Sequence, residues 1–260
     1  MKKILIAAIV CTIALVSNAV SKHKPIYCPG LHTNHLQGIT AKDGKIYWSH
    51  TTKLIKTDFN GNLEEMIDVQ NHHGDLCIDD ENKIYVAVNE GKFNTFDKAK
   101  NFVYVYDTNL NPIDKIAIKE LAGGLGGMEY HNGYFYLVGG IEASLPTFQI
   151  CKFTKDFKLV QTYEIPVLDS YLGVQTICYA YGKFWLGCYL KPKAKLPLWE
   201  LDENFNLIKR HANNGSMGIV KTSDFAGANF LVAHHKKDKS RFASCKSYVT
   251  AEKIVPSEEK

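Results

Sequence analysis

The sequence predicts an all-β fold, a five-bladed β-propeller of four-stranded antiparallel blades. Three observations lead to this prediction. Short apolar or aromatic runs recur along the chain, turn residues separate them, and the whole pattern repeats with starts near residues 35, 72, 124, 173 and 215. Repeats of roughly 40–50 residues with four strands each are typical of propeller blades. A sixth blade is excluded because only 15 residues, 20–34, precede the first repeat after the N-terminal leader.

The first 19 residues predict a secretory signal peptide. Lys2 and Lys3 precede an apolar run from Ile4 to Val16, and Ala19 follows after small residues. A basic start, a short apolar core and small residues before the cleavage point are the signature of such a leader. The run is shorter than the roughly 20 apolar residues that span a bilayer. We therefore expect cleavage after Ala19, a secreted or periplasmic protein and no transmembrane segment.

The remaining chain is predicted to form one propeller domain over residues 20–256, with a polar tail at 257–260. Without the leader it carries 29 basic and 27 acidic residues, a net charge of +2. A chain so close to neutral is not a dedicated nucleic-acid binder, so we expect no nucleic-acid partner. We expect a monomer.

Each repeat begins with a short strand that ends on a large aliphatic residue. A turn and a second, aromatic or apolar strand follow, as in KIYWSH, YFYLVGG and KFWLGCY. Turns such as Asp43-Gly44 and Asn132-Gly133 suit two-residue hairpins, in which both central residues need positive φ. A second hairpin completes each unit, with tips such as TDFNGN and LDENFN whose Asp and Asn side chains favour turns.

The segment PIYC at 25–28 is predicted to close the ring by pairing with FASCKSYV at 242–249, the third strand of blade five. Export permits disulfides, and neighbouring strands would bring Cys28 close to Cys245, so we hypothesise a disulfide between them. The alternative is that the cysteines are buried small hydrophobes. The turn at Tyr181-Gly182 places Cys178 opposite Trp185 and not opposite Cys188.

With these repeats in place, the chain resembles the secreted propellers that carry NHL-type or gluconolactonase/SMP-30-type repeats. The resemblance covers nearly the whole chain after the leader and lies in the order of strands and turns within each blade. It implies a propeller with one site at the channel mouth. The calcium-binding Glu, Asn and Asp set of the gluconolactonase family is not matched residue by residue, so lactonase activity is not implied.

In a propeller, the loops before each inner strand and after each second strand open on one face, the channel mouth. We expect a ligand site there. Glu90 and His235 fall on the same face. The predicted ligand-binding residues are His35, Gln37, His50, His72, His73, Asp75, Asn89, Gln175, Tyr189 and His234.

The chemistry of this face is left open by the sequence. Asp75, Glu90 and His73 are the candidates for catalysis, because a paired-carboxylate hydrolase needs two acids that face one bond. Imidazoles are common metal ligands, but adjacent residues such as His72 and His73 point apart in a strand. We expect no cofactor and no metal, with a divalent cation near Asp75 as the alternative. Without a metal, the histidines are expected to line a water-filled channel.

Three loops of this face stand out. The loops after the second strands of blades four and five, YLKPKAKLP and HHKKDKSR, are rich in lysine and could attract an anionic ligand. The longest loop, from Asn89 to Asn101, carries Phe93 and Phe96, which either stack on a sugar or plug the channel; we favour the plug.

Our first hypothesis is therefore an exported, non-catalytic propeller that binds a small polar or anionic molecule, for instance a glycan. The alternatives are a hydrolase or lactonase at the same mouth, and a protein-interaction scaffold.

Overall fold

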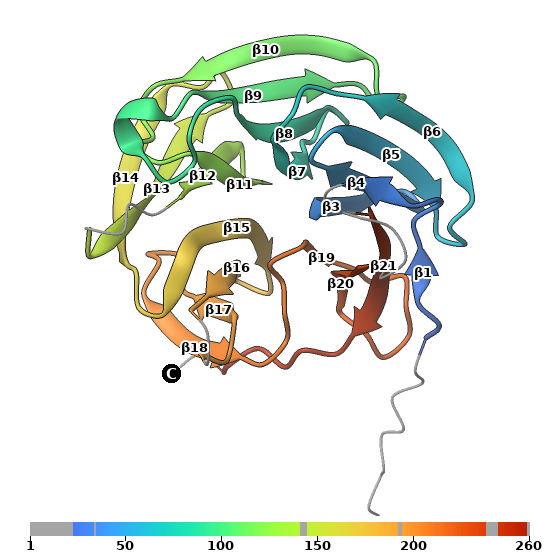
Figure 1. Cartoon of the computed structure of the whole chain (residues 1–260). Helices are drawn as coiled ribbons and strands as arrows, with labels where there is room; N and C mark the ends of the chain where they lie inside the picture. Colours follow the sequence, from blue (N-terminus) through green and yellow to red (C-terminus); the bar gives the residue numbers. More distant parts are fainter. Residues whose placement is uncertain (1–22, 34, 141–144, 192–193, 238–243, 259–260) are drawn as a thin grey trace, which may run out of the picture.

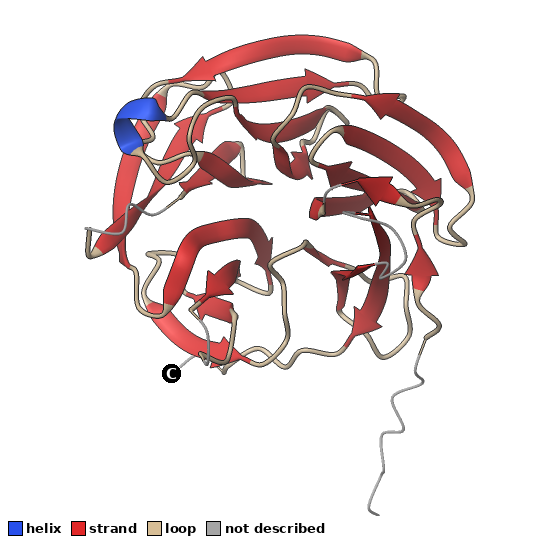
Figure 2. Ribbon diagram, in the orientation of Figure 1, coloured by secondary structure: helices blue, strands red, loops and turns tan. Residues whose placement is uncertain are grey.

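The computed structural model describes residues 23–33, 35–140, 145–191, 194–237 and 244–258. The predicted signal peptide lies outside these residues. Five antiparallel sheets are arranged around a central axis, as Figure 1 shows. In the described part of the chain, the only helical element is a single 3-10 turn, η1 (Phe96–Lys98). The predicted five-bladed propeller is confirmed, and Figure 2 shows its all-β character.

The strands follow one another in chain order, from the centre of the ring outward. Blade 1 consists of β3 (Leu36–Lys42), β4 (Lys45–His50), β5 (Lys53–Asp58) and β6 (Leu63–Asp68). Blade 2 consists of β7 (His73–Ile78), β8 (Ile84–Asn89), β9 (Asn101–Tyr106) and β10 (Pro112–Ile118). Blade 3 consists of β11 (Leu125–His131), β12 (Tyr134–Gly139), β13 (Thr147–Thr154) and β14 (Leu159–Pro166).

Blades 4 and 5 complete the ring. Blade 4 consists of β15 (Ser170–Ala180), β16 (Lys183–Leu190), β17 (Leu198–Leu201) and β18 (Leu207–His211). Blade 5 consists of β19 (Ile219–Lys221), β20 (Phe230–Lys237) and β21 (Ser244–Glu252), with the N-terminal strands β1 (Ile26–Tyr27) and β2 (His32–Thr33) along its outer edge.

The hairpin tips form for the reasons that their sequences suggest. Asp43 and Gly44 have φ of 51° and 74°, and Asn132 and Gly133 have 54° and 81°, as the two-residue turns require. At the second hairpin of three blades an Asp-x-Asn-x-Asn motif closes the turn. In blade 1, Asp58 Oδ1 accepts hydrogen bonds from the backbone N–H groups of Asn60 and Asn62, at 2.8 and 2.9 Å. The motif therefore has a structural role in the turn.

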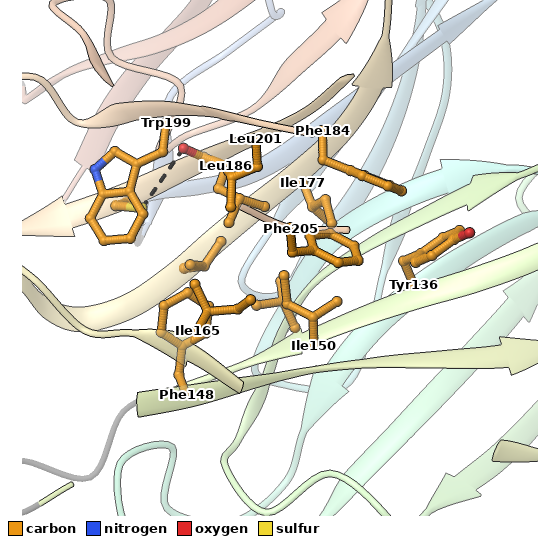
Figure 3. Packing of buried hydrophobic residues seen from close by; sticks show 13 residues of the cluster. Tyr136, Phe148, Ile150, Ile165, Ile177, Phe184, Leu186, Trp199, Leu201 and Phe205 are labelled. Carbon is orange, nitrogen blue, oxygen red and sulfur yellow. Dashed lines mark hydrogen bonds between the residues drawn. The ribbon is translucent and has the colours of Figure 1, made fainter. Parts of the chain in front are cut away.

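The core lies between neighbouring blades. Figure 3 shows one such cluster, in which Phe148 and Ile150 of blade 3 face Phe184 and Leu186 of blade 4, all of them buried. Each buried side chain of this size contributes about 1.5–3 kcal/mol relative to exposure. Because inner strands are covered on both sides, a strand such as β8 is buried along its whole length, whereas the outer strand β6 is largely exposed. This is why the inner strands read as unbroken apolar runs.

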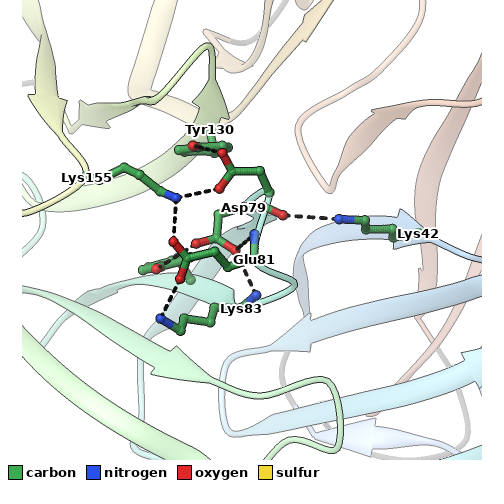
Figure 4. Close-up of polar contacts among 8 residues, drawn as sticks. Lys42, Asp79, Glu81, Lys83, Tyr130 and Lys155 are labelled. Atoms are coloured by element: carbon green, nitrogen blue, oxygen red, sulfur yellow. Dashed lines mark hydrogen bonds and ion pairs between the residues drawn. The ribbon is translucent and has the colours of Figure 1, made fainter.

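Ion pairs join the blades on the face of the hairpin tips, opposite the mouth. Figure 4 shows Lys155 of blade 3 bonded to Asp80 and Glu81 of blade 2, at 2.5 and 2.9 Å between Nζ and the carboxylate oxygens. Tyr130 of blade 3 also donates to Asp80, and Lys42 of blade 1 donates to the carbonyl of Asp79. The carboxylates of Asp80 and Glu81 thus already have partners in blade 3.

The ring closes as the sequence predicts, but without the proposed disulfide. Ile26 pairs with Val249 and Tyr27 with Tyr248, so the N-terminal strand completes the blade that the C-terminal strands begin. Cys28 follows this register, and its backbone N–H donates to the carbonyl of Ser247, whereas Cys245 lies opposite His32. The two cysteines are therefore out of register, and both are thiols. The proposed Cys28–Cys245 disulfide is wrong. Cys178 does lie opposite Trp185, as predicted.

Candidate functional site at the channel mouth

The channel centre is occupied by an acid that holds three blades together. Asp75, on the inner strand β7 of blade 2, is 2% exposed. Its Oδ2 accepts a hydrogen bond from the backbone N–H of Ile177 in blade 4, at 3.0 Å. The backbone N–H groups of Leu76 and Met128 also donate to this carboxyl group. Asp75 thus links blades 2, 3 and 4 across the channel, a contact here called the cross-channel tie, and its side chain is buried.

The inner strands approach this acid very closely. A Cβ added to Gly38 of blade 1 would stand 2.4 Å from Asp75 Oδ1 and 2.5 Å from its Cα. Burial raises the pKa of the Asp75 carboxyl well above its ordinary value, and the nearby Glu129 raises it further. Burial in this dry centre thus disfavours the charged form of the carboxyl group.

Glu129, on β11 of blade 3, is a second acid near the axis. The residue is partly exposed, but protein surrounds its carboxyl group, and burial raises the pKa of this group to about 7. The backbone N–H of Tyr179 donates to Oε2 at 2.9 Å, and that of Tyr130 donates to Oε1 at 2.8 Å. Both oxygens are thus engaged within the protein.

The long loop of blade 2 covers the channel near blade 3. The carbonyl of Phe93 accepts a hydrogen bond from the N–H of Gly124 at 2.9 Å, and the Phe93 ring lies over Gly126 and Gly140. A Cβ at Gly126 would meet the ring at 2.9 Å. Glycine is required here because the ring rests directly on the backbone. The Phe93 ring therefore folds inward onto blade 3, and its role as a channel plug stays a prediction.

Two further predicted residues of blade 2, His73 and Asn89, serve the scaffold. His73 is fully buried; its Nδ1 bonds to the carbonyl of Gln70 and its Nε2 to the hydroxyl of Tyr106, at 2.6 and 2.9 Å. Burial lowers the pKa of His73 to about 4, so the imidazole is neutral near pH 7. Asn89 Oδ1 accepts the N–H groups of Gly91 and Lys100, which shapes the long loop.

Glu90 points away from Asp75. It accepts hydrogen bonds from Tyr104 of β9 and Lys115 of β10, both at 2.7 Å, so it lies toward the outside of blade 2. The structure therefore does not bring the two candidate catalytic carboxylates together.

The other predicted residues differ in burial and lie on different blades. His72 is exposed and has a φ of 70°. Gln175 is buried, and Tyr189 is partly buried, with its hydroxyl 3.8 Å from the sulfur of Met217. His234 bonds to Thr250 at 2.8 Å within blade 5. The structure does not gather these four side chains into one constellation.

The mouth end of blades 1 and 5 does gather a constellation. His35 and His235 are partly exposed, with ring centroids 6.0 Å apart, and Gln37 bonds to His35 and to Thr51. Beneath them lies a fully buried group, here called the closure cluster: Cys28, His32 and His50. The Cys28 sulfur is 3.8 Å from His32 Nε2 and 4.0 Å from His50 Nε2, and the two imidazole rings are 4.3 Å apart.

The electrostatics of this sector are one-sided. Burial and the neighbouring His32, His35 and His235 hold the pKa of His50 well below its usual range. Burial, His235 and Lys237 lower the pKa of His35 in the same way. Burial also raises the pKa of the Cys28 thiol. Among the described residues, no carboxylate contributes to the pKa shifts of these histidines.

Sequence reasoning found only part of this sector. His35 and His50 were predicted to lie on the mouth, but Cys28 and His32 were not, because they precede the first blade. The signal was a Cys-x-x-x-His spacing in the segment that closes the ring, which brings those residues beside the end of β4. Of the lysine-rich loops, Lys193, Lys239 and Arg241 lie outside the described residues; Lys191, Lys236 and Lys237 are exposed.

Comparison with known proteins supports the fold. No protein-family profile matches the chain, and no curated sequence does. The GH43_1 enzyme of Xanthomonas citri, solved with xylotriose, has a similar structure at a TM-score of 0.59 and 13% identity, over 87% of this chain and 90% of that one. The α-L-arabinofuranosidase CtGH43 of Clostridium thermocellum gives a TM-score of 0.52 at 14% identity, over 85% and 93% of the two chains.

A protein of unknown function from Bacteroides thetaiotaomicron gives a TM-score of 0.50 at 14% identity, over 84% of this chain and 57% of that one. At such identities these likenesses concern the fold. Among the described residues, no helix is both long and apolar enough to cross a membrane.

Proposed function

We propose that this protein is an exported propeller that binds an anionic ligand, such as an acidic glycan, at the mouth sector between blades 1 and 5. The observation that carries the proposal is the concentration of imidazoles and lysines there, with no carboxylate among the described residues contributing to the pKa shifts of its histidines. Because the pKa values of His35 and His235 are lowered, the positive potential comes from the exposed Lys236 and Lys237, and it raises the local concentration of anions at a nearly neutral protein.

Specific side chains could receive the ligand. Lys236 and Lys237 are exposed at the mouth end of β20, and His35 and His235 are partly exposed beside them. Gln37 is positioned by its bond to Thr51 and can offer a polar contact. A bound anion would raise the pKa of His35 and His235, and would thereby add charge-assisted hydrogen bonds to the lysine contacts.

Binding is favoured over hydrolysis by the state of the acids. A paired-carboxylate hydrolase needs two acids about 5–10 Å apart that face one bond. Asp75 is fully buried and bonded to backbone N–H groups, both oxygens of Glu129 are engaged, and Glu90 is bonded to Lys115. None of these three acids is directed at a ligand in the mouth.

The test is a binding titration with defined probes. We would titrate polygalacturonate and sulfated oligosaccharides, with neutral xylotriose as the uncharged comparison, at low and at physiological salt. We expect binding of an acidic probe that weakens as salt rises, because screening reduces the attraction. The double substitution Lys236→Glu and Lys237→Glu should weaken it about tenfold or more.

The matched control is Lys253→Glu, an exposed lysine beyond the opposite end of β21, which should leave binding unchanged. Salt-independent binding of xylotriose alone, or cleavage of any of these probes, would replace the proposal with a neutral-glycan or hydrolase function. Export is tested separately by N-terminal sequencing of the native protein, which should begin at Val20.

A further inference from the structure

We infer that the closure cluster of Cys28, His32 and His50 binds one thiophilic metal ion, zinc(II) or copper(I), which fastens the N-terminal segment to blade 1. One donor atom from each of these three side chains lies within 4.8 Å of the others. The inference does not rest on the proposed ligand.

The distances suit such an ion with small adjustment. With bond lengths of about 2.3 Å to sulfur and 2.0–2.1 Å to nitrogen, a sulfur and a nitrogen on one tetrahedral zinc lie about 3.5–3.6 Å apart. The Cys28 sulfur lies 3.8 and 4.0 Å from the two imidazole nitrogens. A movement of a few tenths of an ångström would therefore bring the sulfur to the required distance from each nitrogen, and the two nitrogens lie within 4.8 Å of each other.

The bonding capacity of these side chains is not met in the protein alone. His50 is 0% exposed, and its Nδ1 has no hydrogen-bond partner among the described residues, while its Nε2 has only a long contact with the thiol. A buried imidazole with such weak partners is costly, because it has lost water without a replacement. A metal ion on Nε2 would replace the long thiol contact of this nitrogen with a strong bond, and the ring's proton would stay on Nδ1.

The donor set selects the kind of metal. One sulfur and two imidazoles are soft or borderline donors, which favour zinc or copper over calcium and magnesium. His32 Nε2 also lies 2.8 Å from the carbonyl oxygen of Pro29. To bind the ion, this nitrogen must give up the proton that it shares with that carbonyl. Cys28 must likewise lose its proton, so metal uptake releases protons to solvent.

The position in the fold indicates what the metal would do. Cys28 and His32 belong to the segment that completes blade 5, and His50 ends β4 of blade 1. Closure of the ring otherwise depends on the short pairings of β1 and β2 with β21. An ion that bridges the two parts would close a loop of the chain and stabilise the ring against opening at this seam.

The test uses the protein purified without a histidine tag, stripped with a chelator and kept reduced. We would measure metal content by elemental mass spectrometry and titrate zinc(II), copper(I), calcium and magnesium, with the melting temperature as a second readout. We expect one equivalent of zinc or copper and a rise in melting temperature, and no effect of calcium or magnesium. A competition titration decides between zinc and copper.

Matched variants locate the site. Cys28→Ser and His50→Gln should weaken binding about tenfold or more. Cys151→Ser, another buried thiol, and the exposed His72→Gln should bind as wild type. Because a variant could fail to fold, circular dichroism accompanies each one, and cobalt(II) supplies an independent signal. Wild-type protein should show a thiolate-to-cobalt absorption band that Cys28→Ser lacks.

No stoichiometric uptake of zinc or copper by the wild-type protein would overturn the inference. So would uptake that survives both Cys28→Ser and His50→Gln, or that His72→Gln abolishes.

Discussion

The channel centre and the closure cluster are both made of buried polar side chains, but they differ in how well those groups are satisfied. Asp75 receives backbone N–H groups from its own blade and from two others. His50 has one long thiol contact and an unpartnered Nδ1 among the described residues. A satisfied buried group holds a structure together, whereas an unsatisfied one points to a missing partner. The comparison therefore distinguishes the channel centre, which is part of the scaffold, from the closure cluster, which is the candidate metal site.

The largest expected effect comes from removing the cross-channel tie. Asp75→Ala should lower the free energy of unfolding by about 3–5 kcal/mol, because it leaves buried backbone N–H groups of three blades without an acceptor. Urea unfolding, followed by circular dichroism, measures this change. Asp75→Asn keeps one acceptor oxygen and should cost clearly less. Equal stabilities of Asp75→Ala and the wild type would show that the tie carries no stability.

The second effect is the pH dependence conferred by Glu129. The folded-state pKa is raised from its ordinary value to about 7, so the folded protein holds a proton that the unfolded chain releases at lower pH. Stability from this group is full below about pH 4.5 and is lost as the pH rises to about 7. Relative to wild type, Glu129→Gln should gain about 2–3 kcal/mol across that window.

Unfolding titrations of both proteins at several pH values measure this difference. Burial also lowers the pKa of His50 and His73, but both histidines are common to the two proteins, so their contribution to the pH dependence cancels in the comparison. A difference that stays constant from pH 4.5 to pH 7 would contradict the raised pKa.

The smallest expected effect concerns His50 of the closure cluster. In metal-free protein, His50→Leu should change the free energy of unfolding by no more than about 1 kcal/mol, because it removes a buried nitrogen that has no partner. The same substitution should abolish the rise in melting temperature caused by zinc or copper. A loss of several kcal/mol without metal would mean that the His50 ring is already well bonded in the protein.

Much of the fold could be predicted from local sequence. Asp43-Gly44 and Asn132-Gly133 set their turns because their backbone can take positive φ, and Tyr181-Gly182 likewise fixed the pairing of Cys178 with Trp185. The period of the repeats determined the number of blades, and PIYC at 25–28 was recognised as the closing strand. These features follow from short-range backbone preferences and from strand periodicity, which the sequence states directly.

The candidate site depended on contacts that no local pattern contains. The register of the closing strand placed Cys28 near His50, and a two-residue offset in pairing kept it out of line with Cys245. Likewise, whether Asp75 faced the mouth or the opposite blade was decided by the close approach of Gly38 and the N–H of Ile177. Sequence alone determined which strands this protein forms. Packing around the axis decided which of its buried polar side chains have hydrogen-bond partners among the described residues and which do not.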